Sequence, residues 1–283
     1  MPTKKKKRKK SYKSKSRGLS QFATLVLMSL VGLLLIGGFL VWTATRPATG
    51  DEAQSVCILV VDRTGSFEND SIADRRNLAR STVEGCRDER ARMSIAYFSS
   101  ATDKLNFLAD GNGDRSFDLW KQKSQNSSRS RQELEKAVET AEGVAVSAFD
   151  APSGQGSDVI TALRDSAASA NQSARKLGVD NRFVIMVSDG GQNYGEVNVD
   201  AALKNPGVSV QSLIDRVKQL GGLPELDDVY VYFIGPETGA PSDAKNEQAL
   251  PTRRRQFWEG LVEASGGKVC TYGNDTIDVP VPC

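Results

Sequence analysis

The sequence predicts an α/β fold. In this fold a doubly wound, mostly parallel six-stranded sheet carries helices on both faces and follows one transmembrane helix. Apolar, β-branched runs of strand length, such as residues 56–62 and 183–187, alternate with stretches of helical period. These runs lack a polar face, which is typical of parallel strands covered by helices on both sides. An uncharged stretch, residues 22–42, precedes the first of them and indicates the membrane span.

The chain begins with a basic tail, residues 1–21. Residues 1–18 carry ten of the 37 Lys and Arg residues and no acid, whereas residues 51–283 carry 26 basic and 35 acidic residues, a net charge of −9. Such a tail can be a nuclear localisation signal or a nucleic-acid arm. Beside a spanning helix, however, it is expected to be the cytoplasmic flank, with residues 4–17 attracting anionic lipid head groups. No nucleic-acid partner is expected.

The membrane segment is predicted from length and composition. Residues 22–42, as a helix, would be about 31 Å long, which matches a hydrocarbon core of roughly 30 Å. A cleaved signal peptide is the alternative, but its apolar region would be shorter and would end in a small-x-small site. Thr43-Ala44-Thr45 matches that site poorly. We expect a single-pass protein with a cytoplasmic N-terminus, a linker at residues 43–54 and an extracytoplasmic domain at residues 55–283, in the periplasm or on the cell surface.

Strands and helices alternate within that domain. Five strands are expected, at residues 56–62, 92–99, 182–188, 228–234 and 268–272. Five helices are expected, at residues 69–86, 130–142, 157–171, 210–220 and 251–264. Ser157 is expected to be the N-cap of the third helix. Residues 190–209 are expected to form a polar loop.

Cysteine usage points to an oxidising compartment. The chain has four cysteines and no histidine, and no Cys-x-x-Cys pair, which argues against a zinc site. Cys57 opens the first strand and Cys86 closes the following helix, and these ends meet at one edge of a doubly wound sheet. A Cys57–Cys86 disulfide is therefore expected, and Cys270 and Cys283 would pair by elimination. The alternative is four buried free thiols.

The most informative motif follows the first strand. The apolar run ends in Asp62, and two hydroxyls follow at alternate positions, Thr64 and Ser66. Open α/β sheets place their ligand sites at this end of their strands. Alternate residues of a short turn can face one point, so these side chains would offer only hard oxygen ligands with few carboxylates. Such a set suits Mg²⁺ or Mn²⁺.

This motif, Asp-x-Thr-Gly-Ser, resembles the von Willebrand factor type A (vWA) domain and its metal-ion-dependent adhesion site. Two further segments match in order, Gly-Ser-Asp-Val-Ile-Thr-Ala-Leu at residues 156–163 and an apolar run ending in Ser-Asp-Gly at residues 183–190. The resemblance covers roughly residues 55–272. It implies a Rossmann-like fold with a short antiparallel edge strand at residues 104–108, the sixth strand of the sheet.

The resemblance also implies roles for the site residues. Thr64 or Ser66, together with Ser157, would contact the metal directly. Asp62 and Asp189 would act through waters or by orienting hydroxyls. With so few charged ligands the ion would stay electrophilic and bind an acidic side chain of a protein ligand, as is common in the family. Thr64 stands where Ser is usual and Ser157 where Thr is usual, and both keep the hydroxyl.

We therefore expect a Mg²⁺-dependent binding module and not an enzyme. Without histidine, a Ser-His-Asp or Cys-His centre is impossible. Asp62 in its Asp-Arg-Thr-Gly-Ser turn also resembles the nucleophile of haloacid dehalogenase-type phosphotransferases. The later strand, however, supplies only Asp189 where those enzymes usually have paired acids. A second alternative is a structural vWA domain whose degenerate site binds no metal.

Overall fold

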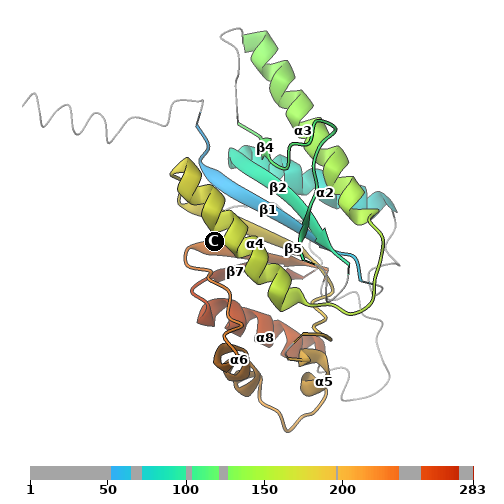
Figure 1. The fold of residues 1–283 in the computed structure, drawn as a ribbon, viewed down its shortest axis with the longest axis vertical. Helices are drawn as coiled ribbons and strands as arrows, with labels where there is room; N and C mark the ends of the chain where they lie inside the picture. The colour runs from blue at the N-terminus through green and yellow to red at the C-terminus, as the bar shows by residue number, and fades with distance from the viewer. Residues whose placement is uncertain are drawn as a thin grey trace, which may run out of the picture. The chain divides into compact units, whose positions relative to one another are not determined.

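A central sheet organises the chain in the computed structural model, which describes residues 52–64, 72–99, 104–120, 127–195, 197–235, 250–273 and 283 (Figure 1). The strand order is β3-β2-β1-β5-β6-β7, and β4 also pairs with β2. The pairs β1–β2, β1–β5, β5–β6 and β6–β7 are parallel, whereas β3 and β4 run antiparallel to β2. The strands are β1 (Ser55–Asp62), β2 (Ala91–Phe98), β3 (Asn106–Phe107), β4 (Phe117–Asp118), β5 (Asn181–Val187), β6 (Val229–Ile234) and β7 (Lys268–Gly273).

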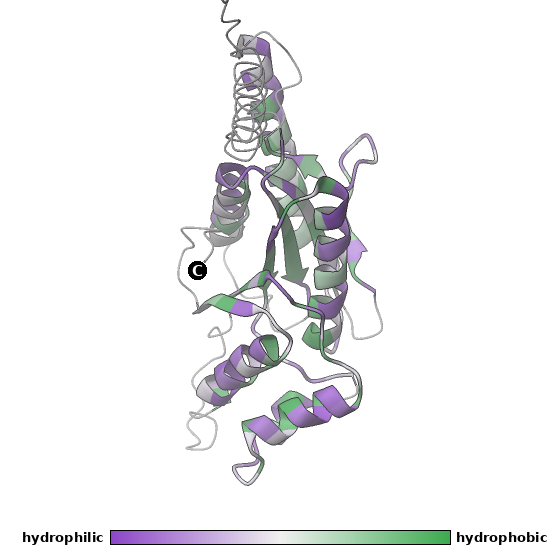
Figure 2. Ribbon diagram, turned by 90° about the vertical axis from the view of Figure 1, so that its left-hand side faces the viewer, coloured by the Kyte–Doolittle hydropathy of each residue, from purple (hydrophilic) through white to green (hydrophobic). Residues whose placement is uncertain are grey.

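Helices cover both faces of this sheet. In the described part of the chain they are α2 (Ile72–Asp88), α3 (Ser127–Phe149), α4 (Val159–Leu177), α5 (Val199–Leu203), α6 (Val210–Gln219) and α8 (Leu250–Ala264). All eight residues of β1 are buried, and alternate side chains enter different cores. Ile58 and Val60 belong to a core cluster that includes residues of α4, α5, α6 and α8, whereas Leu59 and Val61 belong to a second cluster with residues of α2 and α3. Figure 2 shows the central strands as the most hydrophobic part of the fold.

The predicted fold class is confirmed at the level of a mostly parallel α/β sheet with helices on both faces. The predicted number of six strands is wrong, because the described residues already form a sheet of seven strands. The additional strand, β4, has only two residues, and Phe117 and Asp118 pair with Met93 and Arg92 of β2. A two-residue strand is too short to produce a periodic pattern in the sequence.

Two local predictions also need correction. The expected loop at residues 190–209 contains the short helix α5, whose N-cap Asn198 accepts a hydrogen bond from Ala201 N. The N-cap of α4 is Asp158 and not Ser157, because the Asp158 side chain accepts the hydrogen bond from Thr161 N. Ser157 is therefore free to use its hydroxyl elsewhere.

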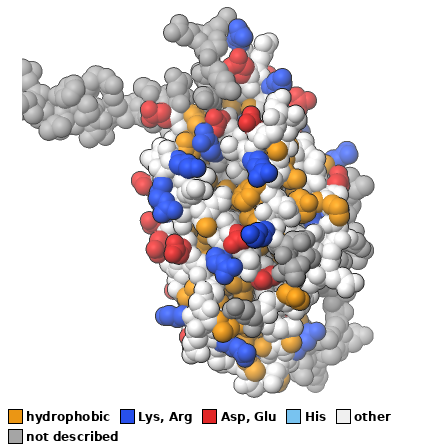
Figure 3. All heavy atoms as spheres, viewed as in Figure 1, with side chains coloured by type: hydrophobic (Ala, Val, Ile, Leu, Met, Phe, Trp, Pro, Cys, Tyr) orange, Lys and Arg blue, Asp and Glu red, His pale blue; other side chains and the backbone are white. Residues whose placement is uncertain are grey.

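Helix α4 shows how the sequence pattern forms one layer of the fold. Its buried side chains, among them Leu163, Ala167 and Ala170, recur at helical spacing and face the sheet. Gly178 ends the helix in the left-handed conformation, with φ 69°, and its N–H bonds to Ala174 O. The outer side of α4 faces the viewer in Figures 1 and 3, and there basic and acidic side chains lie interspersed.

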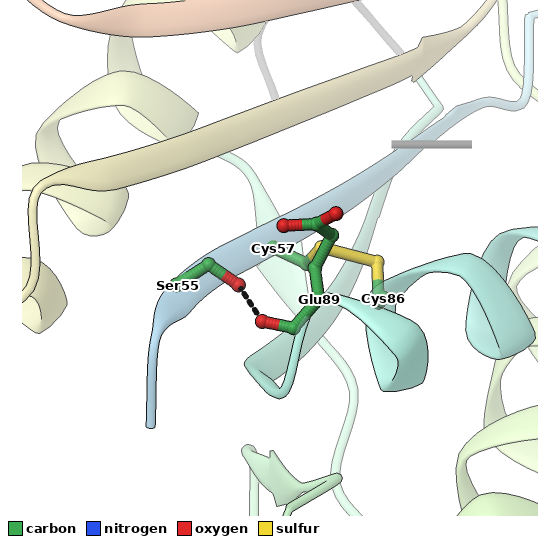
Figure 4. The surroundings of a disulfide bond; sticks show 4 residues. All are labelled: Ser55, Cys57, Cys86 and Glu89. Carbon is green, nitrogen blue, oxygen red and sulfur yellow. Dashed lines mark hydrogen bonds between the residues drawn. A yellow bond between two sulfur atoms is a disulfide. The ribbon is translucent and has the colours of Figure 1, made fainter. Parts of the chain in front are cut away.

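Both cysteine pairs are bonded, with Cα–Cα distances of 6.1 Å for Cys57–Cys86 and 5.6 Å for Cys270–Cys283. These distances lie in the usual range for disulfides. Cys57 near the start of β1 meets Cys86 near the end of α2 (Figure 4). Beside this bridge the Ser55 hydroxyl donates a hydrogen bond of 2.8 Å to the carbonyl of Glu89, the residue that follows α2. The bridge and this hydrogen bond together fasten the end of α2 and the residue after it to β1.

No helix in the described residues combines the length and the apolar composition needed to cross a membrane. The predicted spanning segment, residues 22–42, lies outside those residues. The predicted linker and tail, at residues 43–54 and 1–21, lie outside them as well, apart from residues 52–54.

Candidate metal centre

The candidate site lies where β1 and β5 end. Val61 is paired with Val187, so the next residues, Asp62 and Ser188, leave neighbouring parallel strands at the same level. A third segment reaches them from the turn before α4, which begins at Val159. The carboxyl edge of the sheet is thus the meeting point of the three chain segments that the sequence singled out.

The Asp62 carboxylate collects hydrogen bonds from all three segments. Its Oδ1 accepts from Thr64 N at 2.9 Å and from Thr64 Oγ1 at 2.7 Å. Its Oδ2 accepts from Ser157 Oγ at 3.0 Å and from Ser188 Oγ at 2.7 Å. One carboxylate therefore orients three hydroxyls that are distant in the sequence.

The Asp62 carboxylate is buried, and burial disfavours its ionised form. Asp62 is only 1% exposed, and burial raises the pKa of its carboxyl, against the opposing effect of the Ser188 and Thr64 hydrogen bonds. The charge of Asp189 raises this pKa further. The four hydrogen bonds described for Asp62 come from neutral backbone and hydroxyl groups. A bound cation would stabilise the ionised carboxylate.

The hydroxyls suit a hard divalent cation. Thr64 and Ser157 donate their hydroxyl protons to Asp62. Within the described residues no other donor bonds to either hydroxyl oxygen, so the lone pairs of both oxygens can serve a ligand. Ser188 differs, because its oxygen also accepts a 3.0 Å hydrogen bond from Gly190 N. Thr64 and Ser157 therefore fit direct metal contact through oxygen, and Ser188 fits a supporting role that holds Asp62.

Ser157 is brought to the site by contacts with the turn after β1. Arg63 Nε donates to Ala151 O at 2.8 Å, and Gly154 N donates to Arg63 O at 3.1 Å. Thr64 and Gly154 also form an isolated parallel bridge. These contacts fasten the segment before α4 to the end of β1, so Ser157, 2% exposed, lies against Asp62.

Asp189 lies beside this cluster but does not hydrogen-bond to it among the described residues. Its Oδ1 accepts from Gly191 N at 2.8 Å. A Cβ at Gly191 would lie 2.9 Å from Asp189 Oδ1 and 3.3 Å from Asp200 Oδ2, so the two carboxylates flank this glycine. Burial raises the pKa of Asp200, and Arg254 opposes that shift.

Helix α8 holds the loop that carries Asp189. Arg254 donates from Nη1 to Asp189 O at 3.1 Å and forms an ion pair with Asp200 through Nη2, also at 3.1 Å. Trp258 Nε1 donates to Gly190 O at 3.0 Å. Two side chains of α8, Arg254 and Trp258, therefore hold the backbone that follows β5.

The structure thus brings Asp62, Thr64 and Ser157 together and places Asp189 next to them, whereas Ser66 lies outside the described residues. In the described residues no group of three or more His, Cys, Asp or Glu side chains is placed to hold a metal ion. Ser188 is not among the site residues predicted from the sequence. Its place at the end of the strand beside β1 is the sequence feature that could have indicated a role in the site.

Comparison with known proteins finds no matching family model and no matching curated protein. Two similar solved structures are the pilus adhesin SpaC from Lactobacillus rhamnosus GG, with 14% identity and a TM-score of 0.40, and proximal thread matrix protein 1 from the mussel byssus, with 14% identity and a TM-score of 0.34. The matches cover 80% and 76% of this chain, but only 29% and 48% of those chains. Similarity at this level is too weak to support a conclusion about function.

Proposed function

We propose that this chain is a single-pass membrane protein whose extracytoplasmic domain, similar to vWA domains, binds a protein ligand through a Mg²⁺- or Mn²⁺-dependent adhesion site. Thr64 or Ser66, together with Ser157, would supply the direct oxygen ligands. Asp62 and Asp189 would act through waters or by orienting hydroxyls. The protein would act as a binding module and not as a catalyst.

The observation that carries the proposal is the Asp62 carboxylate, which is buried and holds hydroxyls from three chain segments. Orienting hydroxyl protons inward costs conformational freedom and burying a carboxylate costs solvation. Both costs are understandable if the outward lone pairs serve a cation. An ion held mostly by neutral oxygens would retain affinity for a further anionic ligand, which an Asp or Glu of the partner would supply.

The disulfides support the extracytoplasmic part of the proposal. Both lie in the domain that follows the predicted membrane segment, and disulfides persist mainly in oxidising compartments. The basic residues 4–17 and the uncharged residues 22–42 support the anchor with a cytoplasmic N-terminus. The tail would then lie near anionic lipid head groups on the cytoplasmic side.

Calorimetry on the full-length protein in detergent, titrated with Mn²⁺, tests the metal site. Wild type should bind, and Asp62→Ala should lose binding, because it removes both the negative charge and the group that orients Thr64 and Ser157. The matched control is Asp150→Ala, because Asp150 is exposed just after α3 and its removal should leave Mn²⁺ affinity unchanged. Equal affinity of wild type and Asp62→Ala, or a folded wild type without affinity, would contradict the proposal.

The phosphotransferase alternative makes a different prediction, namely turnover of a phosphoester and a trapped aspartyl-phosphate at Asp62. Both Asp62 oxygens already accept two hydrogen bonds each, which leaves little room for nucleophilic attack. A phosphatase assay beside the titration therefore separates the two functions. A pull-down from intact membranes, with Mg²⁺ and with chelator, would then identify the protein ligand.

A further inference from the structure

We propose that Gln192 and Asn193 are positioning residues of the metal site, which clamp the turn before α4 so that the Ser157 hydroxyl faces Asp62. This inference rests on the proposed function for its metal-binding consequence. It assigns roles to two residues that no sequence motif marks, and neither residue is expected to contact the ion.

Asn193 holds the backbone of Ser157 on both sides. Its Oδ1 accepts a 2.8 Å hydrogen bond from Ser157 N. Its own N–H, together with that of Tyr194, donates to Ser157 O at 3.3 Å. The peptide groups on either side of the Ser157 Cα are thereby fixed, and with them the direction in which its side chain leaves the backbone.

Gln192 holds the residues that follow Ser157, at the start of α4. It is 1% exposed, and its Oε1 accepts from Ile160 N at 3.0 Å. Ile160 belongs to the first turn of α4, where backbone N–H groups have no acceptor within the helix. The Gln192 Nε2 donates to Asp158 Oδ1 at 3.0 Å and also to Tyr194 O. Asp158, the N-cap, is thus tied to the same side chain.

The clamp links two of the three segments that make the site. Gln192 and Asn193 follow Ser188 by only a few residues, and Ser188 itself bonds to Asp62. The backbone of the clamp is held in turn, because Asp200 N donates to Gln192 O at 3.2 Å and Asn198 Nδ2 donates to Asn193 O at 3.0 Å. Movement of this loop would therefore shift Ser157 relative to Asp62.

The two residues can be tested by substitutions that remove single hydrogen bonds. Asn193→Ala removes the acceptor for Ser157 N, whereas Asn193→Asp keeps an acceptor oxygen at the same place. Gln192→Ala removes the acceptor for Ile160 N and the donor to Asp158. Supporting residues around metal sites typically contribute 10- to 100-fold in affinity. We expect about that loss of Mn²⁺ affinity for Asn193→Ala and Gln192→Ala.

The control variants should keep wild-type affinity. Asn193→Asp is the conservative rescue, and Gln172→Ala removes an exposed glutamine from the outer side of α4. Full-length proteins in detergent are titrated with Mn²⁺, and their melting temperatures are measured in parallel. A lower melting temperature with unchanged Mn²⁺ affinity in Asn193→Ala and Gln192→Ala would show a merely structural role and overturn the inference.

A second readout keeps this inference separate from the proposed function. Amide hydrogen exchange of Ser157 and Ile160 is measured without metal in each variant. Faster exchange at Ser157 in Asn193→Ala and at Ile160 in Gln192→Ala supports the clamp, even if wild type binds no Mn²⁺ and the proposed function fails. Unchanged exchange at both positions would overturn the clamp, whatever the metal titration shows.

Discussion

At the scale of single residues, Asp62 carries most of the interactions of the candidate site. Its two oxygens accept four hydrogen bonds, three of them from the side chains of Thr64, Ser157 and Ser188. A buried carboxylate with several hydroxyl partners depends on each of them, because a lost donor leaves an acceptor without compensation for its lost solvation. Substitutions of the hydroxyls should therefore have separable effects on metal binding and on stability.

Thr64 offers a nearly isosteric test. Thr64→Val removes the hydroxyl and keeps the shape, so we expect Mn²⁺ binding to be lost and the protein to be destabilised by about 1–3 kcal/mol. Thr64→Ser keeps the hydroxyl and removes one methyl group, so binding should persist at a cost of about 0.8 kcal/mol in stability. Metal titration and urea unfolding measure both quantities. Wild-type Mn²⁺ affinity in Thr64→Val would exclude Thr64 as a ligand.

Glu89, near the Cys57–Cys86 bridge, gives a pH-dependent prediction. Burial raises the pKa of its carboxyl, and the neighbouring Asp88 charge raises it further. The folded state then holds the proton more tightly than the unfolded state, so this group's contribution to stability falls as pH rises from its ordinary pKa through the raised value. Glu89→Gln cannot ionise. Urea unfolding across that pH window should show that the stability of Glu89→Gln increases relative to that of wild type as pH rises. Parallel plots of stability against pH for the two proteins would contradict this.

Part of the site could be predicted from the sequence because it lies in local patterns. Asp62 and Thr64 follow an apolar strand directly, and Ser157 lies just before a helix of clear period. Gln192 could not be predicted in this way. Its partners Ile160 and Asp158 lie more than thirty residues earlier, and only the packing of α4 against the sheet brings them within reach.

At the scale of elements, length decides what the sequence reveals. Strands β1 and β5 consist largely of apolar residues, and the predicted ends of both strands lie within one residue of the observed ends. The strand β4 and the helix α5 have two and five residues and depend on neighbours for their stability. The cap of α4 was misassigned because Ser157 and Asp158 are adjacent and both residue types cap helices well.

At this scale, we predict that the disulfide between β1 and α2 stabilises the fold. It closes a loop with a sequence separation of 29 residues, for which chain-entropy estimates indicate about 3–4 kcal/mol. The Cys57→Ala/Cys86→Ala variant should lose roughly that much stability. Urea unfolding measures the loss, and thiol titration of denatured, non-reduced wild type should find no free thiol. Four titratable thiols would exclude both bridges and weaken the extracytoplasmic assignment.

At the scale of the whole molecule, charge divides the chain. Ten basic residues precede the uncharged segment at residues 22–42, and residues 51–283 carry a net charge of −9. The positive-inside rule then orients the proposed anchor with its N-terminus in the cytoplasm. The fold of the domain does not depend on this orientation, so topology has to be tested separately.

Protease accessibility tests that orientation. Protease added outside sealed cells or spheroplasts should digest residues 55–283 and spare the basic tail, because the membrane shields only the cytoplasmic side. Cells made permeable serve as the control, in which both parts should be cut. Protection of the domain in sealed cells would contradict the proposed topology. A mature N-terminus near Arg46 would instead indicate a cleaved signal.

The position of β1 has a mechanical consequence. Its first residues follow the proposed membrane tether, and its last residue, Asp62, lies in the proposed ligand site. A partner that pulls on the domain would therefore load β1 along its length, between β2 and β5 on either side. In this direction the hydrogen bonds to both neighbours resist together in shear, and the Cys57–Cys86 bond limits how far the strand can be drawn out. The strand that forms the site would also bear the tension between membrane and partner.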